Sequence, residues 1–183
     1  MIGRGNERLC YLHPNDDTKV IKVPYKEGKT RDQNRLEYIY NQYLEKNNVS
    51  FAHISRCYGW VDAGEKQGLV FERVVNFDKT AAVTFNQAIQ EKLISTEYAQ
   101  ELLEQLHQYL KNNVILFIDV SLDNIMCQRE DDGSCRLVII DGLGARRPGV
   151  KFWLYLHLRP YAKYKVRSQW KKLLANFNKA IKL

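Results

Sequence analysis

Three polar residues at fixed spacing, beside two apolar runs, constrain the fold of this chain more than any other feature. Asp119 and Asn124 stand five residues apart and follow the apolar run 114–118. Asp141 comes seventeen residues after Asn124, at the end of the apolar run 137–140. A loop aspartate can orient a hydroxyl and accept its proton, and amide and carboxylate oxygens suit magnesium. Each motif alone is also typical of a polar turn, but together they predict a shared site.

The N-terminal part predicts a small antiparallel sheet with one inserted helix. Alternating apolar residues bounded by turn residues indicate strands, and the turn at 13–17 indicates a hairpin. Leu36, Ile39, Tyr40, Tyr43 and Leu44 recur at helical spacing, which predicts an amphipathic helix over 31–46. The strands are expected at 1–2, 7–12, 18–23, 57–61 and 68–75.

The C-terminal part predicts mostly helix. A short helix is expected over 85–92, and a longer one begins near Thr96 and ends at Asn112-Asn113. Two short strands are expected at 125–128 and 136–140, on either side of the turn at 130–133. One or two helices are expected after 149, with Pro160 breaking or bending them.

Two N-terminal features could contact a nucleotide. Gly3 and Gly5 lie between two predicted strands, where glycines let backbone amides approach phosphate; an ordinary hairpin explains them equally well, and Arg8 stands where a third glycine would complete the loop. Lys22 lies inside an apolar strand, so it faces either solvent on an edge strand or a polar partner. Glu37 on the predicted helix is the first choice of partner, and Glu45 is the second.

Taken together, these segments resemble the protein-kinase-like fold and, more narrowly, the bacterial YrbL family of PhoP regulatory network proteins. The resemblance spans about residues 2–175. The segments that carry it are Ile2-Gly3-Arg4-Gly5, Cys10-Tyr11-Leu12-His13-Pro14, Val20-Ile21-Lys22-Val23, Phe71-Glu72-Arg73-Val74-Val75-Asn76-Phe77-Asp78 and Ser121-Leu122-Asp123-Asn124-Ile125-Met126-Cys127.

The resemblance implies a fold, two cofactors and a set of residue roles. The fold is α+β and two-lobed, with a five-stranded antiparallel sheet plus helix in an N-lobe over 1–75 and a reduced, mainly helical C-lobe over 76–183. The cofactors are ATP and Mg²⁺. The implied roles are a glycine-rich loop at Gly3 and Gly5, a lysine–glutamate pair at Lys22 and Glu37, a hinge strand from Glu72 to Val74 whose backbone meets adenine, a catalytic aspartate at Asp119, and metal ligands at Asn124 and Asp141.

Several positions depart from the kinase pattern. Phe117-Ile118 stands where kinases carry His-Arg, and Ser121 replaces the loop lysine that neutralises the transferred phosphate. Asp141-Gly142-Leu143-Gly144 departs from Asp-Phe-Gly, and only 42 residues follow Asp141. The platform that binds peptide substrates is therefore expected to be mostly absent. The sequence predicts either a phosphotransferase for an unknown acceptor, such as a small molecule or glycan, or an inactive pseudokinase that acts as a regulatory module.

The net charge of +7 is concentrated at the C-terminal end. Residues 145–183 contain eleven Lys or Arg and no Asp or Glu. Such a segment could bind nucleic acid or an anionic surface, with interleaved aromatics that include Trp153, Tyr164 and Trp170. It could equally be a solvated helix whose aromatics complete the core.

Composition favours a cytoplasmic protein with one sizeable core. The 183 residues are 45% hydrophobic, and no apolar stretch is long enough to span a bilayer. The first ten residues lack an apolar signal core. Four cysteines without close spacing, at 10, 57, 127 and 135, predict buried, reduced thiols.

Overall fold

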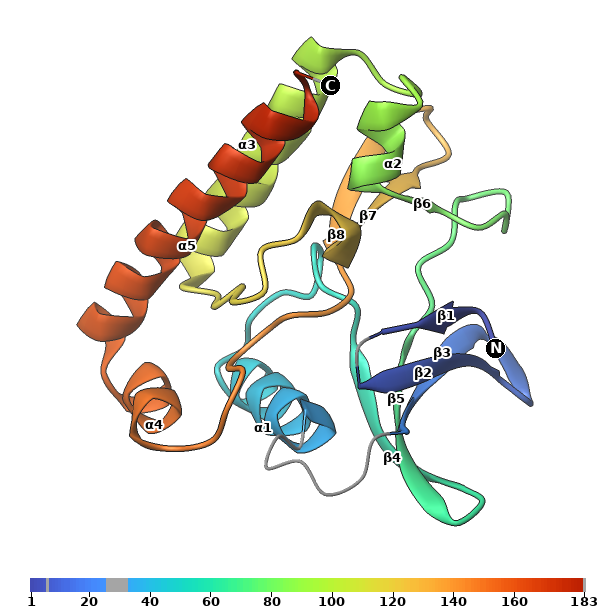
Figure 1. Ribbon diagram of the computed structural model, residues 1–183, viewed down its shortest axis with the longest axis vertical. Helices are drawn as coiled ribbons and strands as arrows, with labels where there is room; N and C mark the ends of the chain where they lie inside the picture. Colours follow the sequence, from blue (N-terminus) through green and yellow to red (C-terminus); the bar gives the residue numbers. More distant parts are fainter. Residues whose placement is uncertain (6, 26–32, 183) are drawn as a thin grey trace.

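The computed structural model of the protein describes residues 1–5, 7–25 and 33–182. Its N-terminal sheet is antiparallel throughout, with the strand order β1-β2-β3-β5-β4 (Figure 1). The strands are β1 (Gly3–Arg4), β2 (Arg8–His13), β3 (Asp16–Pro24), β4 (Cys57–Ala63) and β5 (Lys66–Glu72). The predicted five-stranded antiparallel sheet is therefore confirmed.

Most strand boundaries in this sheet differ from the sequence prediction by one to three residues, and two of them bear on the site. The first strand was expected at 1–2 and lies at 3–4, because the pairing with β2 is centred on Gly3 opposite Cys10. The last strand was expected to reach Val75 but ends at Glu72. The Arg73 amide still donates to Thr18 O of β3 at 2.7 Å, and the chain then leaves the sheet, since Val75 forms only an isolated bridge with Ala81.

Helix α1 (Gln33–Lys46) is inserted between β3 and β4 and packs against β4 and β5. Its apolar face is the predicted one, since Leu36, Tyr40 and Leu44 are buried. Residues 31 and 32, where the helix was expected to begin, lie outside the described residues.

A second, three-stranded sheet joins the N-terminal sheet to the helices. It has the order β6-β7-β8, with β6 (Val83–Thr84), β7 (Ile125–Arg129) and β8 (Cys135–Ile139). Two-residue β6 was not predicted; it directly precedes α2 (Phe85–Gln90). Ile139 at the end of β8 accepts a hydrogen bond from the Ser55 amide and donates one to His53 O, each at 2.9 Å. This bridge fixes the end of β8, and hence Asp141, next to the first sheet.

The C-terminal helices are α3 (Thr96–Asn113), α4 (Val150–His157) and α5 (Arg159–Ala180). Pro160 was expected to break or bend the tail helices, and the break is present: α4 ends at His157 and α5 begins at Arg159, with Pro160 in its first turn. Proline is well tolerated there because the first amides of a helix have no intrahelical partner. Helices α3 and α5 run side by side (Figure 1). No helix within the described ranges is both long and apolar enough to cross a bilayer.

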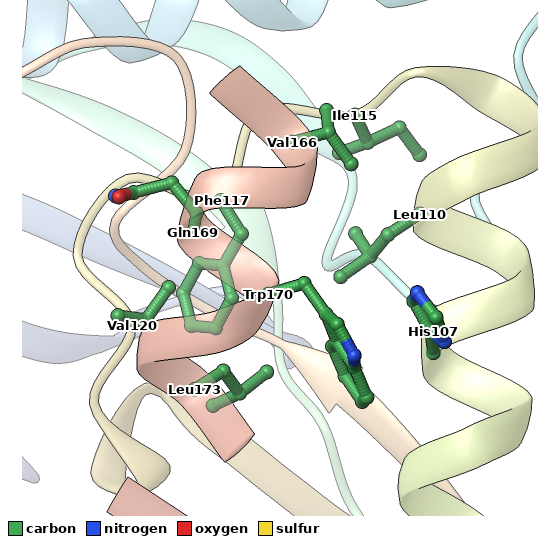
Figure 2. Close-up of a pocket in the computed structure, with 9 residues that line it drawn as sticks. All are labelled: His107, Leu110, Ile115, Phe117, Val120, Val166, Gln169, Trp170 and Leu173. Atoms are coloured by element: carbon green, nitrogen blue, oxygen red, sulfur yellow. The ribbon is translucent and has the colours of Figure 1, made fainter. Parts of the chain in front are cut away.

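Side chains of α3 and α5 face each other around a small pocket (Figure 2). Trp170 of α5 stacks on His107 of α3, with ring centroids 3.9 Å apart. The cavity beside this pair has a volume of about 10 Å³, which is at or below the space that one water molecule needs. Trp170 therefore contributes to the core, which agrees with the interpretation that the aromatics of the C-terminal segment complete the core.

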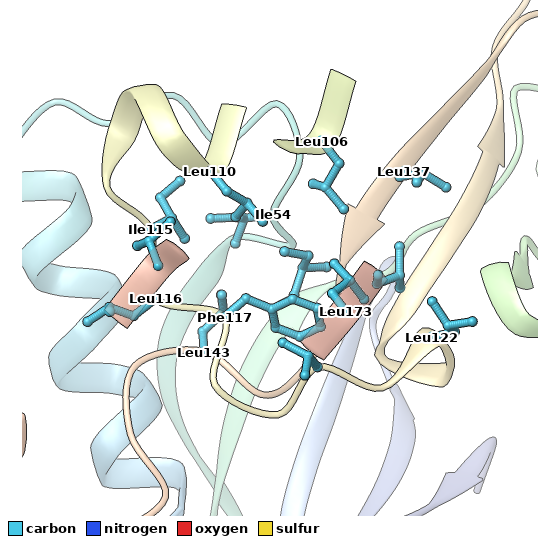
Figure 3. Close-up of a cluster of buried hydrophobic side chains, with 14 of the residues drawn as sticks. Ile54, Leu106, Leu110, Ile115, Leu116, Phe117, Leu122, Leu137, Leu143 and Leu173 are labelled. Atoms are coloured by element: carbon cyan, nitrogen blue, oxygen red, sulfur yellow. The ribbon is translucent and has the colours of Figure 1, made fainter. Parts of the chain in front are cut away.

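One large apolar core extends from α1 to α5 (Figure 3). Phe117, which stands two residues before Asp119, is only 2% exposed within it. The same core contains Leu122, Ile139 and Leu143, which flank Asn124 and Asp141 in the sequence. The polar residues of the predicted site are thus held by backbone segments whose neighbouring side chains are buried.

Candidate active site

The loop that contains Asp119 is paired with the segment after Asp141. Gly142 O accepts hydrogen bonds from the amides of Ile118 and Asp119, at 2.8 and 3.0 Å, and the Gly144 amide donates to Leu116 O at 2.9 Å. Tyr40 of α1 supports the same segment, because its hydroxyl accepts from the Leu116 amide at 2.8 Å. Asp119 and Asp141, which are 22 residues apart in the sequence, are therefore brought together through backbone contacts.

Gly142 is required at this crossing. Its φ of +84° is in the left-handed region that residues with a side chain rarely adopt. A Cβ at this position would lie 2.8 Å from Asp119 Cβ and 2.9 Å from Asp119 O. The Asp-Gly dipeptide therefore serves both as a turn, as one interpretation held, and as the contact between the two halves of the site.

Asn124 is fixed by both of its neighbours in the site. It ends the short 3₁₀ helix η1 (Leu122–Asn124), and its Nδ2 donates to Asp119 O at 2.9 Å. Its own carbonyl accepts from the Ile140 amide at 2.9 Å. Ser121 caps η1 by accepting from the Asp123 amide at 3.3 Å, so the residue that replaces the expected lysine has a structural role.

Four charged side chains form a cluster between β2, β3, α1 and the end of β8. Lys22 Nζ lies 3.5 Å from Glu37 Oε2 and 3.7 Å from Asp141 Oδ2, and it donates to Ile140 O at 2.6 Å. The predicted Lys22–Glu37 pair is thus present. Glu45, the second choice, is exposed on the same helix. The fourth member of the cluster is Arg8, which completes a set of two cations and two carboxylates.

Arg8 is the residue that sequence reasoning missed. It was noted only as the place of a missing glycine, yet its side chain is 8% exposed and binds both carboxylates. Its two terminal nitrogens lie 2.8 and 3.1 Å from the Glu37 oxygens, and Nη2 lies 2.8 Å from each Asp141 oxygen. Asn34 Oδ1 accepts from Nη1 at 2.9 Å. An arginine flanked by strand residues was the only available signal.

The cluster shifts the ionisation of its members. Burial by itself raises the pKa of Asp141, but the charges of Lys22 and Arg8 and the hydrogen bond from the Gly142 amide outweigh it, and the pKa lies well below its usual range. Burial likewise opposes the charge of Arg8, but Glu37 and Asp141 raise its pKa above the ordinary value. Asp141 is therefore held as a carboxylate and Arg8 as a cation.

In the predicted glycine turn and hinge, some backbone groups already form hydrogen bonds within the protein. Gly3 is a β1 residue and Gly5 donates its amide to Arg8 O at 2.9 Å, so that amide is already used. In the hinge, the Glu72 amide donates to Arg56 O and its carbonyl accepts from Ser55 Oγ, both at 2.8 Å. Within the described ranges, no hydrogen bond uses the backbone of Val74.

Asp119 faces a second set of residues. Its side chain is 53% exposed and pairs with Arg146, with Nη2 2.6 Å from Oδ1. Both residues line a pocket of about 330 Å³ together with residues of α5. Gln169 Nε2 donates to Ile118 O at 2.5 Å and Asn176 Nδ2 donates to Val120 O at 2.7 Å. Helix α5 thus holds the backbone on both sides of Asp119, a role that no sequence motif indicated.

The metal-ligand types fit magnesium. Asp141 offers carboxylate oxygens, and the Nδ2 bond of Asn124 leaves its Oδ1 outside the hydrogen bonds of the described residues. Two protein oxygens plus phosphate oxygens are a usual set for magnesium in nucleotide sites. Arg8 competes for the same carboxylate, since it donates to both Asp141 oxygens. Magnesium would therefore have to displace Arg8 from Asp141 or share that carboxylate with it.

The sheet, the inserted helix and the helical half define a protein with a kinase-like fold. A crystal structure of the PknI kinase domain of Mycobacterium tuberculosis, a cysteine-to-alanine mutant, superposes with a TM-score of 0.58 over 96% of this chain and 72% of that one, at 14% identity. Residues 1–178 match the family described as PhoP regulatory network protein YrbL. The YrbL proteins of Escherichia coli K12 and Shigella flexneri are each 30% identical over 146 residues, which cover 78% of this chain and 70% of theirs. The chain therefore belongs to the YrbL family.

Proposed function

We propose that this protein binds ATP with Mg²⁺ and transfers the γ-phosphoryl group to an acceptor hydroxyl. The observation that carries the proposal is the convergence of Asp119, Asn124 and Asp141 around Gly142, beneath the Lys22–Glu37 pair. These residue types in this arrangement supply what phosphoryl transfer requires, namely positioning and charge neutralisation.

Each residue has a separate role in the proposed reaction. Lys22 would hold nucleotide phosphates, with Glu37 keeping its ammonium group in place at 3.5 Å. Asp119 would orient the acceptor hydroxyl and accept its proton. Asn124 and Asp141 would hold magnesium, which when bound neutralises charge on the phosphates. The Val74 backbone would meet the adenine base.

A second candidate function is a pseudokinase that serves as a regulatory module. The observation that favours it is the bond from Arg8 to both oxygens of Asp141, because a guanidinium occupies the carboxylate that a metal needs. The family description as a PhoP regulatory network protein agrees with a regulatory role. In this case nucleotide binds weakly or not at all, and no transfer follows.

Binding and transfer should be measured separately. Thermal shift with ATP and Mg²⁺, each alone and together, is expected to show stabilisation that needs both and that Asp141→Ala removes. Transfer of labelled γ-phosphate, to water or to added hydroxyl compounds, is expected to fall about 10²- to 10⁴-fold in Asp119→Asn while nucleotide binding persists.

Asp123→Asn is the matched control. Asp123 lies in the same loop, but its side chain accepts from Asn86 Nδ2 at 2.9 Å, away from the charge cluster. Wild-type transfer in this variant would show that the loss in Asp119→Asn is specific. Absence of transfer by the wild type, with or without nucleotide binding, would favour the pseudokinase.

A further inference from the structure

The pocket beside Asp119 is a built feature of the C-terminal half. Its volume of about 330 Å³ lies in the range of small-molecule sites. The loop contributes Asp119, the segment after Asp141 contributes Arg146, and α5 contributes Lys165 and Lys172. The complete lining is Ile118, Asp119, Val120, Ser121, Arg146, Lys165, Gln169, Lys172 and Asn176.

One face of α5 both builds the loop and presents the cations. Positions 165, 169, 172 and 176 recur at helical spacing and therefore share one face. Gln169 and Asn176 on this face hold Ile118 O and Val120 O, and Lys165 and Lys172 lie between and beside them. The backbone positions of the two lysines are therefore fixed relative to the Asp119 loop; Lys165 is half-buried and Lys172 is exposed.

The pocket carries an excess of positive charge. Three cations and one carboxylate line it, so two positive charges are uncompensated. Partial burial, followed by the charges of Lys172, Lys151 and Arg146, lowers the pKa of Lys165, as expected where cations crowd. No acidic residue follows Asp141 in the sequence, so the tail itself supplies no counter-charge.

We propose that this pocket is the acceptor site, and that it takes a small molecule bearing a phosphate monoester and a free hydroxyl. The proposal rests on the phosphotransfer proposed above. A phosphate monoester carries a charge of about −1.5 to −2 at pH 7, which matches the two uncompensated charges. A guanidinium such as that of Arg146 can bind phosphate oxygens with two parallel hydrogen bonds.

The same anion explains how Asp119 becomes available. Arg146 now pairs with Asp119 at 2.6 Å, and a bound phosphate would draw Arg146 away from the carboxylate. Asp119 could then accept the proton of the acceptor hydroxyl, whose oxygen forms a bond to the γ-phosphorus. The bond from that phosphorus to the β,γ-bridging oxygen breaks, and ADP leaves with the electron pair. The products are ADP and an acceptor with two phosphate groups.

Glycerol 3-phosphate is a suitable probe, because it has both groups, and glycerol is its neutral counterpart. Isothermal titration of the full chain, without ATP, is expected to show binding of the first compound only. The variant Lys165→Gln/Lys172→Gln should weaken this binding at least tenfold. The matched control, Lys163→Gln/Lys171→Gln, removes the same charge from exposed positions of α5 outside the pocket and should bind as the wild type does.

Further arms identify the source of the phosphate. Vesicles of phosphatidylcholine with phosphatidic acid present the same group as a lipid headgroup, and a single-stranded polyribonucleotide presents phosphodiesters. Retention of either that only the pocket variant loses, without binding of glycerol 3-phosphate, would assign the phosphate to that source. It would overturn the small-molecule acceptor, because phosphatidic acid has no free hydroxyl and the polyribonucleotide has phosphodiesters. If the pocket variant and the control variant lose retention equally, binding reflects the overall charge of residues 145–183, which would also contradict a specific anion site in the pocket.

The two proposals fail in different ways. If glycerol 3-phosphate binds through the pocket but no γ-phosphate transfer is found with any acceptor, the anion site stands and the phosphotransfer proposal is wrong. If transfer occurs and the pocket variant binds and transfers as the wild type does, the acceptor site is wrong. Absence of glycerol 3-phosphate binding by the wild type would also overturn it.

Discussion

The two sides of the site differ in net charge: one is balanced and the other is positive. On the side of the N-terminal sheet, Arg8 and Lys22 face Glu37 and Asp141, and the four charges cancel at distances of 2.8 to 3.7 Å. On the side of α5, three cations face the single carboxylate of Asp119. Both sides meet at Gly142, whose carbonyl holds the Asp119 loop.

The charges on one side are balanced within the protein, and those on the other side are balanced only by a ligand. Buried charges are tolerated only when they are paired and hydrogen-bonded, and the cluster around Arg8 satisfies that condition without a ligand. The excess charge beside α5 is tolerated because the residues are more exposed, and it is compensated only when an anion arrives. We therefore expect substitutions in the cluster to change stability as well as nucleotide binding, and substitutions in the pocket to change acceptor binding with little effect on stability.

The largest effect is expected from Glu37→Ala. The substitution leaves two buried cations facing one carboxylate, and breaking a buried pair costs about 3 to 5 kcal/mol. Urea unfolding at neutral pH measures the loss. Glu45→Ala on the exposed side of α1 is the control and should change the free energy of unfolding by less than about 0.5 kcal/mol. A loss of similar size in both variants would show that the helix, and not the cluster, is responsible.

Gly142→Ala tests the junction between the two sides. Gly133 has the same φ of +84° in the β7–β8 turn, but a Cβ there would meet nothing within 4 Å. Gly133→Ala should therefore cost only the backbone strain, about 1 kcal/mol. Gly142→Ala should cost about 1 to 3 kcal/mol more, because the new Cβ overlaps Asp119. Equal losses on urea unfolding would mean that the Asp119 loop moves aside freely.

Asp141→Asn tests the cluster through pH. Because the folded pKa of Asp141 lies below its unfolded value of about 3.9, the unfolded state binds more protons, and stability falls as the pH is lowered from about 5 toward the folded pKa. The wild type should lose more stability than Asp141→Asn between about pH 5 and pH 3. The effect is smaller than for Glu37, because the Asp141 side chain is 37% exposed.

The control for acid unfolding is Asp131→Asn, which removes an exposed carboxylate from the β7–β8 turn. Its pH dependence should match that of the wild type. If Asp141→Asn kept the full acid sensitivity while Asp131→Asn lost it, the assignment of the acid-labile group to the cluster would be wrong.

The fold was predictable because its signals are local. Apolar alternation in the strands and the spacing of Leu36, Tyr40 and Leu44 depend only on neighbouring residues, and the order of polar motifs indicated the topology. Boundaries were less accurate where tertiary pairing decides them, as at the end of β5, where the Arg73 amide still bonds Thr18 O of β3 but Val75 pairs only with Ala81. The helix break near Pro160 was predictable, but its exact position was not, because proline suits the first turn of a helix as well as a break.

The site was predictable only in part. Asp119, Asn124, Asp141, Lys22 and Glu37 carry a pattern of order and spacing, and the structure brings them together. Arg8 and Arg146 carry none, because their roles depend on partners 133 and 27 residues away. The net charge of the cluster and that of the pocket depend on which residues the fold brings together, so neither can be obtained by counting charges along the sequence.

The smallest effect on the free energy of unfolding is expected from Lys165→Gln, which should stabilise the protein, whereas substitutions in the cluster destabilise it. The folded pKa of Lys165 is lowered, so its charge opposes folding at neutral pH, and its removal should raise the free energy of unfolding by up to about 0.5 kcal/mol. The gain should shrink at about 1 M salt, where charges more than about 3 Å apart are screened. Lys163→Gln removes the same charge outside the pocket and should give a smaller gain. Urea unfolding at low and high salt measures the free energy of unfolding of both variants. Equal gains would show that charge repulsion is spread along α5. A lower free energy of unfolding in Lys165→Gln would mean that the positive charge of the pocket is already compensated within the protein.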